Sequence, residues 1–183
     1  MRKTGWLLFS ALLVALCALP AVSFAEDAPE SGASNMPQRE RELIDILMSA
    51  RKSYQTSHSP SPAKDARMDM QIRVISFMRQ SQLATDWVGT VKSRGITPDG
   101  AAWISIEIAD GITISTWQSE REDADSATMF KPHAKLFAAA QSAKIASPII
   151  FSGTILKSVL ASDEEMVTHP QFIARFTSLK PAQ

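Results

Sequence analysis

The sequence predicts a mainly β fold with an N-terminal helical hairpin, in which five strands close into a small barrel. Three observations lead to this prediction. Apolar residues recur at helical spacing between Gln38 and Gln82, period-two alternation replaces that spacing after Asp86, and the later elements follow the order β-β-β-α-β-β. This order is that of a five-stranded OB-fold, a partly open Greek-key barrel that commonly binds ligands.

Residues 1–25 have the features of an export signal. Arg2 and Lys3 give a positive start, 6–19 is an apolar run without charge, and Ala25 closes a small-residue site for signal peptidase. We expect cleavage after Ala25 and a periplasmic protein with no stable membrane anchor. A retained anchor is the alternative, but the apolar run is shorter than the roughly 20 residues that span a bilayer.

Cysteine content and charge narrow the class of protein. Cys17 is the only cysteine and falls in the signal, so the remaining 158 of 183 residues cannot form a disulfide. Basic and acidic residues number 19 each in the whole chain, and removal of Arg2 and Lys3 leaves 17 against 19. This balance argues against binding to nucleic acid or anionic lipid through overall charge, while a local basic patch stays open.

The next two segments are a leader and a helical hairpin. Residues 26–37 are rich in Ala, Ser, Glu and Pro and predict a flexible leader. The hairpin spans 38–83, with a first helix from Gln38 to Tyr54 and a second from Ala63 to Gln82. In the second helix an apolar arc is wide enough to indicate contact on two sides, and its methionines are interpreted as core rather than as an adaptable binding surface. The residues of this arc are Met68, Met70, Ile72, Val74, Ile75, Phe77 and Met78.

The predicted OB-fold domain spans 86–179. Its strands are expected at Trp87–Lys92, Ala101–Ile108, Ile112–Trp117, Ile149–Leu156 and Phe172–Leu179. A helix is expected at His133–Ala143, between the third and fourth strands, and a polar loop at Ser162–His169.

The register of the second and third strands follows from their isoleucines. A three-residue loop, Ala109-Asp110-Gly111 with Gly111 in the left-handed region, gives one face made almost wholly of isoleucine, whereas a two-residue loop would mix polar groups into that face. The three-residue loop predicts the pairs Ile108–Ile112, Ile106–Ile114, Ile104–Thr116, Glu107–Thr113, Ser105–Ser115 and Trp103–Trp117.

The opposite face of this hairpin is the candidate ligand site. Paired indoles on the second and third strands would form a stacking platform for a base, a sugar ring or a proline-rich peptide. The alternative is that the helical hairpin covers these indoles. The candidate ligand-binding residues are Trp103, Trp117, Ser105, Ser115, Lys92 and Arg94.

No catalytic, metal or cofactor site is predicted. The run Glu120–Asp125 offers alternating oxygen ligands for calcium but lacks the turn glycine of an EF-hand loop, so it is interpreted as a solvated loop. His58, His133 and His169 fall in or beside different loops, and the common nucleophile and zinc motifs do not occur.

Short motifs in the barrel region resemble a known group. They are Trp87-x-Gly89, Phe151-Ser152-Gly153 and Pro170-x-Phe172-x-x-x-Phe176. With these, residues 87–179 resemble small exported bacterial OB-fold proteins of the tRNA anticodon-binding-like group. The resemblance implies the fold alone and carries over no ligand or catalytic residue.

The sequence thus predicts an exported, periplasmic and non-catalytic interaction module that binds another envelope protein. The contact would use the helical hairpin or the face of the second and third strands. The alternative function is binding of an oligosaccharide or single-stranded nucleic acid on Trp103 and Trp117.

Overall fold

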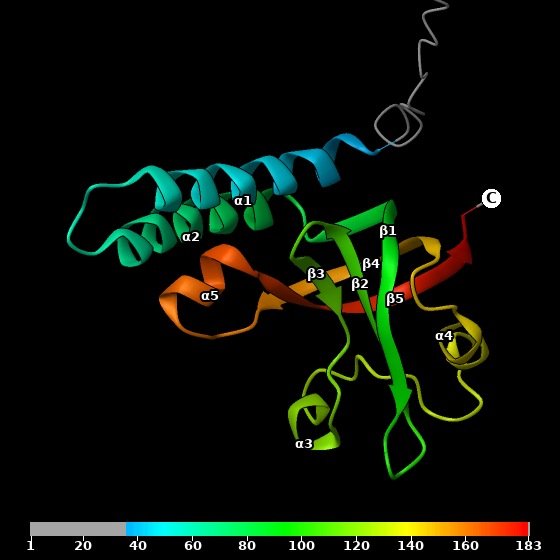
Figure 1. Cartoon of the computed structure of the whole chain (residues 1–183). Coiled ribbons are helices and arrows are strands. Elements are labelled where there is room, and N and C mark those ends of the chain that lie inside the picture. The colour runs from blue at the N-terminus through cyan, green and yellow to red at the C-terminus, as the bar shows by residue number, and fades with distance from the viewer. Residues whose placement is uncertain (1–35, 183) are drawn as a thin grey trace, which may run out of the picture. The chain divides into compact units, whose positions relative to one another are not determined.

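The computed structural model describes residues 36–182, which belong to one compact unit. The expected signal (1–25) and nearly all of the expected leader (26–37) lie outside the described residues. Within the described part, two long helices pack beside a five-stranded barrel (Figure 1). None of the helices described there is both long and apolar enough to cross a bilayer.

The helical hairpin consists of α1 (Gln38–Thr56) and α2 (Pro62–Gln80), close to the predicted bounds. Pro37 occupies the N-cap of α1, and Pro62 begins α2, where a missing N–H costs nothing. Arg39 closes the open end of the hairpin, because its guanidinium donates to the carbonyls of Phe77 and Ser81 and lies 4.0 Å from the Phe77 ring centre. The buried side chains between the helices and against the barrel are Leu43, Leu47, Ala50, Ala66, Met70 and Phe77.

The barrel confirms the predicted OB-fold. Its strands are β1 (Leu83–Ile96), β2 (Ala102–Ala109), β3 (Ile112–Ser115), β4 (Pro148–Ser158) and β5 (Gln171–Pro181). They close in the order β1-β2-β3-β5-β4, with β3 and β5 parallel and the other neighbours antiparallel. This is the order of a five-stranded Greek-key barrel.

The register of β2 and β3 agrees with the prediction at three pairs, Ser105–Ser115, Ile106–Ile114 and Glu107–Thr113. Gly111 has φ of +68°, as expected for the turn. The end of the hairpin differs, because Ile112 pairs with Ala109 and the ladder shifts between Glu107 and Ala109. The bulge still lets both Ile108 and Ile112 point into the core, where they are buried.

Isoleucines and aromatic rings fill the barrel. Ile104, Ile106 and Ile114 have no exposed surface. Phe151 meets Trp87 edge-on at 6.2 Å between ring centres and Phe176 at 5.4 Å, the arrangement that aromatic quadrupoles favour. The predicted apolar face of the ribbon is therefore the core of the molecule.

Three short helices join the strands: α3 (Glu120–Asp123), α4 (Phe137–Ser142) and α5 (Asp163–Thr168). The predicted helix at 133–143 is shortened to α4, which packs against β1, β2 and β5 through the fully buried Ala140. The expectation of a polar loop at 162–169 is wrong. Ser162 caps α5 by accepting a hydrogen bond from the Glu165 N–H, and Met166 is buried.

Candidate functional site

Trp103 of the predicted platform lies flat against the neighbouring strand. It pairs with Gly95 of β1, and a Cβ added at Gly95 would come within 2.7 Å of the indole ring. Gly95 therefore makes room for Trp103, which is half-buried. The indole uses one face for packing on its own sheet.

Trp117 lies beyond the end of β3, so the predicted cross-strand pair with Trp103 does not form. The Trp117 N–H donates to Thr128 Oγ1 (2.9 Å) and its indole Nε1–H donates to Ser126 Oγ (3.3 Å). The place beside β2 is taken by Phe130, which exchanges two backbone hydrogen bonds with Ala102. In the described part of the chain, the aromatic–aromatic contacts do not include these two indoles, and the Trp117 ring instead lies under the Lys157 ammonium, 5.0 Å from the ring centre.

The other predicted site residues have separate environments. Ser105 and Ser115 face each other and are buried, and Ser115 Oγ accepts from Gln171 Nε2 of β5 (2.9 Å). Lys92 forms an ion pair with Glu107 (3.0 Å), and Arg94 is exposed on β1. The structure brings the two serines together but buries them, which leaves little polar surface between the indoles.

The acidic run after Trp117 stabilises a loop. Asp123 Oδ1 accepts from both the N–H and the hydroxyl of Thr128 at 2.6 Å, and Oδ2 accepts from the Met129 N–H at 3.1 Å. Beside it, Glu120 and Asp99 share a carboxyl–carboxylate hydrogen bond, which raises the pKa of Glu120 and lowers the pKa of Asp99. Both oxygens of Asp123 therefore accept hydrogen bonds from within the loop, two from backbone N–H groups and one from the Thr128 hydroxyl.

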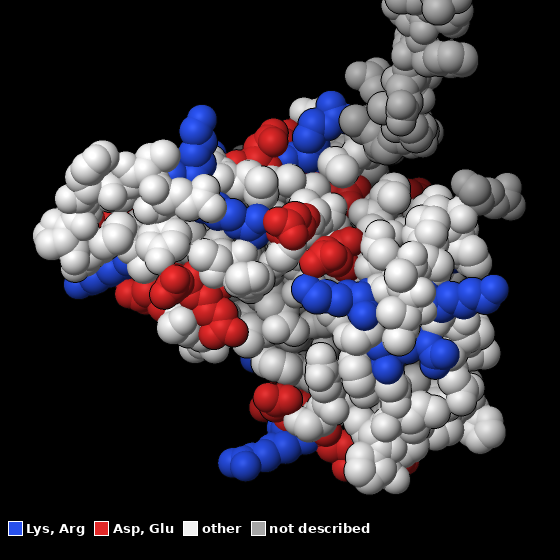
Figure 2. Space-filling model, in the orientation of Figure 1, with Lys and Arg blue, Asp and Glu red and all other residues white. Residues whose placement is uncertain are grey.

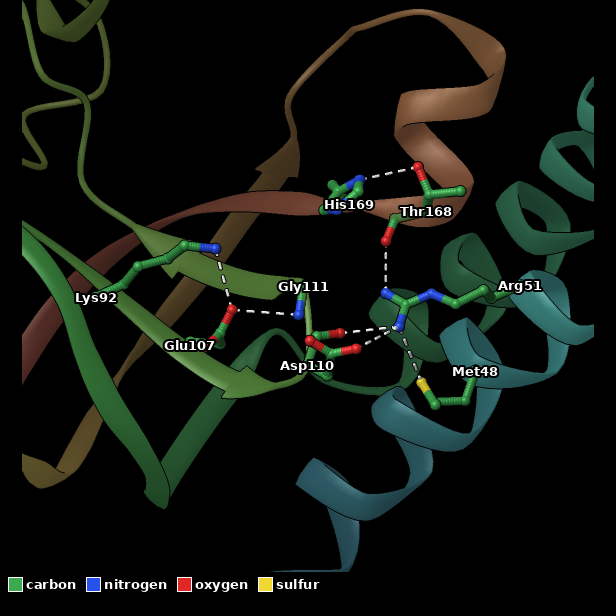
Figure 3. A network of polar contacts seen from close by, with 8 residues as sticks. All are labelled: Met48, Arg51, Lys92, Glu107, Asp110, Gly111, Thr168 and His169. Carbon is green, nitrogen blue, oxygen red and sulfur yellow. Dashed lines mark hydrogen bonds and ion pairs between the residues drawn. The ribbon is translucent and has the colours of Figure 1, made fainter. Parts of the chain in front are cut away.

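Arg51 fastens the helical hairpin to the barrel (Figure 3). Its guanidinium donates to the Thr168 carbonyl at the end of α5 (2.6 Å) and to the Asp110 carbonyl in the β2–β3 turn (2.9 Å). The Asp110 carboxylate lies 3.7 Å away. On the same turn, Glu107 accepts from the Gly111 N–H and pairs with Lys92. One α1 side chain thus fixes two loops of the barrel.

Glu40 is a second link between α1 and the barrel. Its carboxylate is fully buried, and both oxygens accept from the Val88 N–H at 3.0 and 3.2 Å. Val88 pairs with Ile150 of β4, but the ladder between β1 and β2 begins only at Thr90. Burial raises the pKa of Glu40 to about 7, partly offset by the Val88 hydrogen bond. Glu40 thus occupies the edge of β1 where β2 has ended.

The outer face of α2 carries an apolar stripe. Met68, Ile72 and Ile75 are spaced four and three residues apart and are 49%, 67% and 52% exposed. Met70 and Phe77, on the opposite face, are buried. The sequence indicated apolar contact on two sides of this helix. In the described residues α2 packs against both α1 and α5, and Met68, Ile72 and Ile75 lie outside these contacts. We call Met68, Ile72 and Ile75 the α2 stripe.

A groove adjoins the α2 stripe, between α2 and the barrel. It has a volume of about 330 Å³ and a mostly apolar lining. Arg79 and Lys157 are exposed on its rim, and its lining contains neither Asp nor Glu. We call it the α2 groove; its apolar lining residues are Val74, Ile75, Met78, Leu156 and Phe172.

Charged side chains of both signs are spread over the described surface outside the α2 stripe and α2 groove. On the face in Figure 2, positive and negative side chains are interspersed over both the helices and the barrel, in keeping with the balanced composition. Comparison with protein-family models, with curated proteins and with solved structures gave no match. The α2 stripe and the α2 groove are thus the candidate site that the geometry itself provides.

Proposed function

We propose that this chain is a non-catalytic interaction module, exported to the periplasm, that binds a segment of another envelope protein on the α2 stripe and α2 groove. The observation that supports this proposal is the exposure of Met68, Ile72 and Ile75 on a helix whose other face is already packed. Apolar side chains at i, i+4 and i+7 are the usual anchors for a partner helix. Contiguous exposed apolar area of this kind is uncommon on a surface without a partner.

The charges around this surface indicate the chemistry of the partner. Lys64 and Arg79 stand at the two ends of the α2 stripe, and Lys157 lies on the rim of the α2 groove. The acidic residues beside the stripe already have partners, because Asp65 accepts from the Ser59 hydroxyl and Asp69 pairs with Arg73. A complementary segment therefore presents apolar side chains flanked by Asp or Glu. A second copy of this chain fits less well, because a two-fold contact on the groove would oppose the same basic rim.

Two designed amphipathic peptides test the proposal on the purified protein. They share one apolar stripe and differ only in the flanking residues, Glu in one and Lys in the other. We expect the Glu-flanked peptide to bind more tightly, and Ile72→Asp to weaken its binding about tenfold or more. Arg79→Glu should reverse the preference between the peptides. The matched control is Ile145→Asp, which places the same charge on an exposed isoleucine beyond α4.

Photo-cross-linking in cells that export the protein identifies the natural partner. A photoreactive residue at position 75 should give an adduct that disappears in Arg79→Glu, and one at the exposed Lys52 on α1 should not give that adduct. Equal binding of both peptides together with no effect of Ile72→Asp would overturn the proposal. An adduct between two copies of this chain would replace it with self-association.

A further inference from the structure

A second cleft is lined in part by α4 and the residues after it. Figure 1 shows α4 on the other side of the barrel from α2. Its volume is about 410 Å³, which is within the range of small-molecule sites. We call it the α4 cleft. Its apolar lining comes from α4 and from β1, β4 and the end of β5, and consists of Val91, Ala139, Ala143, Pro148, Ile149, Leu179, Pro181 and Ala182. Three of these residues are alanines, whose short side chains leave the floor of the cleft apolar and unobstructed.

Backbone hydrogen bonds hold the walls of the α4 cleft. The Ala146 N–H donates to the Val91 carbonyl (2.8 Å), and the Val91 N–H donates to the Ser147 carbonyl (3.0 Å). Ala146 has φ of +62°, so the chain bends sharply at this point to reach β1. At the far wall, the Ala182 N–H donates to the Pro148 carbonyl (3.2 Å). The cleft is thus formed in advance of any ligand.

Charge in the α4 cleft has one sign. Lys144 and Lys180 line it and are exposed, and within residues 36–182 neither forms an ion pair. No Asp or Glu contributes to the lining. The side-chain hydroxyls of Ser142 and Ser147 donate to nearby carbonyls, so they are already used. The cleft combines an apolar floor with two ammonium groups for which the described residues provide no counter-charge.

We infer that the α4 cleft binds a small amphiphile with an apolar body and one carboxylate. The body would displace water from the alanine-lined floor, and the carboxylate would sit between the Lys144 and Lys180 ammonium groups. A neutral amphiphile would gain only the burial of its apolar body on the floor of the cleft. A cationic one would meet two like charges.

Amide chemical shifts of the purified protein, followed during titration with decanoate, test the inference. Acetate, decanol and decylammonium are the comparison probes, each kept below its aggregation concentration. We expect saturable shifts at Val91, Ala143, Ile149 and Leu179 with decanoate, about fivefold weaker binding of decanol, and none with acetate. The double variant Lys144→Gln/Lys180→Gln should bind decanoate and decanol equally. The matched control, Lys64→Gln on α2, should leave the preference intact.

A cavity-filling variant gives a second readout. Ala143→Phe should abolish binding of both decanoate and decanol, while the unperturbed part of the spectrum reports that the protein is folded. Equal responses to decanoate and decylammonium, or shifts that map to the α2 groove, would overturn the inference. The inference would also be overturned if Lys144→Gln/Lys180→Gln still bound decanoate more tightly than decanol. This second variant keeps the test valid if Ala143→Phe does not fold.

Discussion

The Glu40 carboxylate accepts the Val88 N–H with both of its oxygens, at 3.2 and 3.0 Å, in a site with no exposed surface. This contact satisfies a backbone donor on β1 that β2 does not reach, because the β1–β2 ladder begins at Thr90. It also places an ionisable group in a desolvated position, which penalises the charged form. The helical hairpin and the barrel are therefore joined by a contact that depends on pH.

The first prediction concerns the pH dependence of stability. The pKa of Glu40 is raised from 4.5 to about 7 in the folded protein, so folding favours the protonated acid. Protonated Glu40 stabilises the folded state fully at pH values below 4.5, the pKa of the group in the unfolded chain. This stabilisation is lost as the pH rises through about 7, and the total loss in the free energy of unfolding is about 3 kcal/mol. Glu40→Gln removes this titration. In urea unfolding between about pH 5 and about pH 8, wild type should lose stability relative to Glu40→Gln. A difference between the two that stays constant with pH would contradict the assignment.

The strand order and the β2–β3 register were predictable because they depend on local patterns. Ile104, Ile106 and Ile108 alternate with polar residues, and Gly111 supplies the positive φ of the turn. The role of Glu40 was missed, although a signal existed. Glu40 precedes Leu43 and Leu47 by three and seven residues and so falls on the apolar stripe of α1.

The site itself was less predictable, because it depends on contacts distant in sequence. The Trp103–Trp117 pair required β3 to continue past Ser115, but Phe130 takes that place beside Ala102. The sequence likewise placed Met68, Ile72 and Ile75 on one flank of α2 without showing whether another element covers them. In the described structure α1 and α5 pack against the other side of α2, and this flank stays exposed.

The second prediction concerns Arg51, whose side chain is 12% exposed and holds two loops of the barrel. Arg51→Ala leaves the carbonyls of Asp110 and Thr168 without this donor and should lower the free energy of unfolding by about 2 kcal/mol. The control is Arg73→Ala on α2, whose side chain is 41% exposed, pairs with Asp69 at 3.9 Å and donates to the exposed Ser49 hydroxyl at 3.2 Å. It should cost less than about 0.5 kcal/mol. Equal losses in chemical unfolding would show that Arg51 has no anchoring role.

The third prediction concerns the packing of Trp103 on Gly95. Gly95→Ala puts a methyl group within 2.7 Å of the indole, so the ring must move. We expect a loss of about 1 to 3 kcal/mol and a shifted indole N–H resonance for Trp103. Arg94→Ala, at the preceding exposed position, should change neither. An unchanged Trp103 resonance in Gly95→Ala would mean that the indole does not rest on this strand and is available as a platform.

The last prediction concerns the cap of α5, the helix that holds one end of the Arg51 contact. Ser162 Oγ accepts from the Glu165 N–H at 3.2 Å, and this hydrogen bond satisfies one of the free donors at the helix start. Ser162→Ala should therefore lower the free energy of unfolding by about 1 kcal/mol. Ser61 provides a matched control, since it occupies the N-cap of α2 without a side-chain capping bond.

Ser61→Ala should consequently change stability by less than about 0.5 kcal/mol. Hydrogen exchange adds a local readout, because loss of the cap should accelerate exchange at Glu165 and Met166 before it affects the barrel strands. If Ser162→Ala and Ser61→Ala lowered the free energy of unfolding equally, the capping hydrogen bond of the Ser162 hydroxyl would not be what stabilises α5. In that case the burial of Met166 and Val167 alone would have to account for α5.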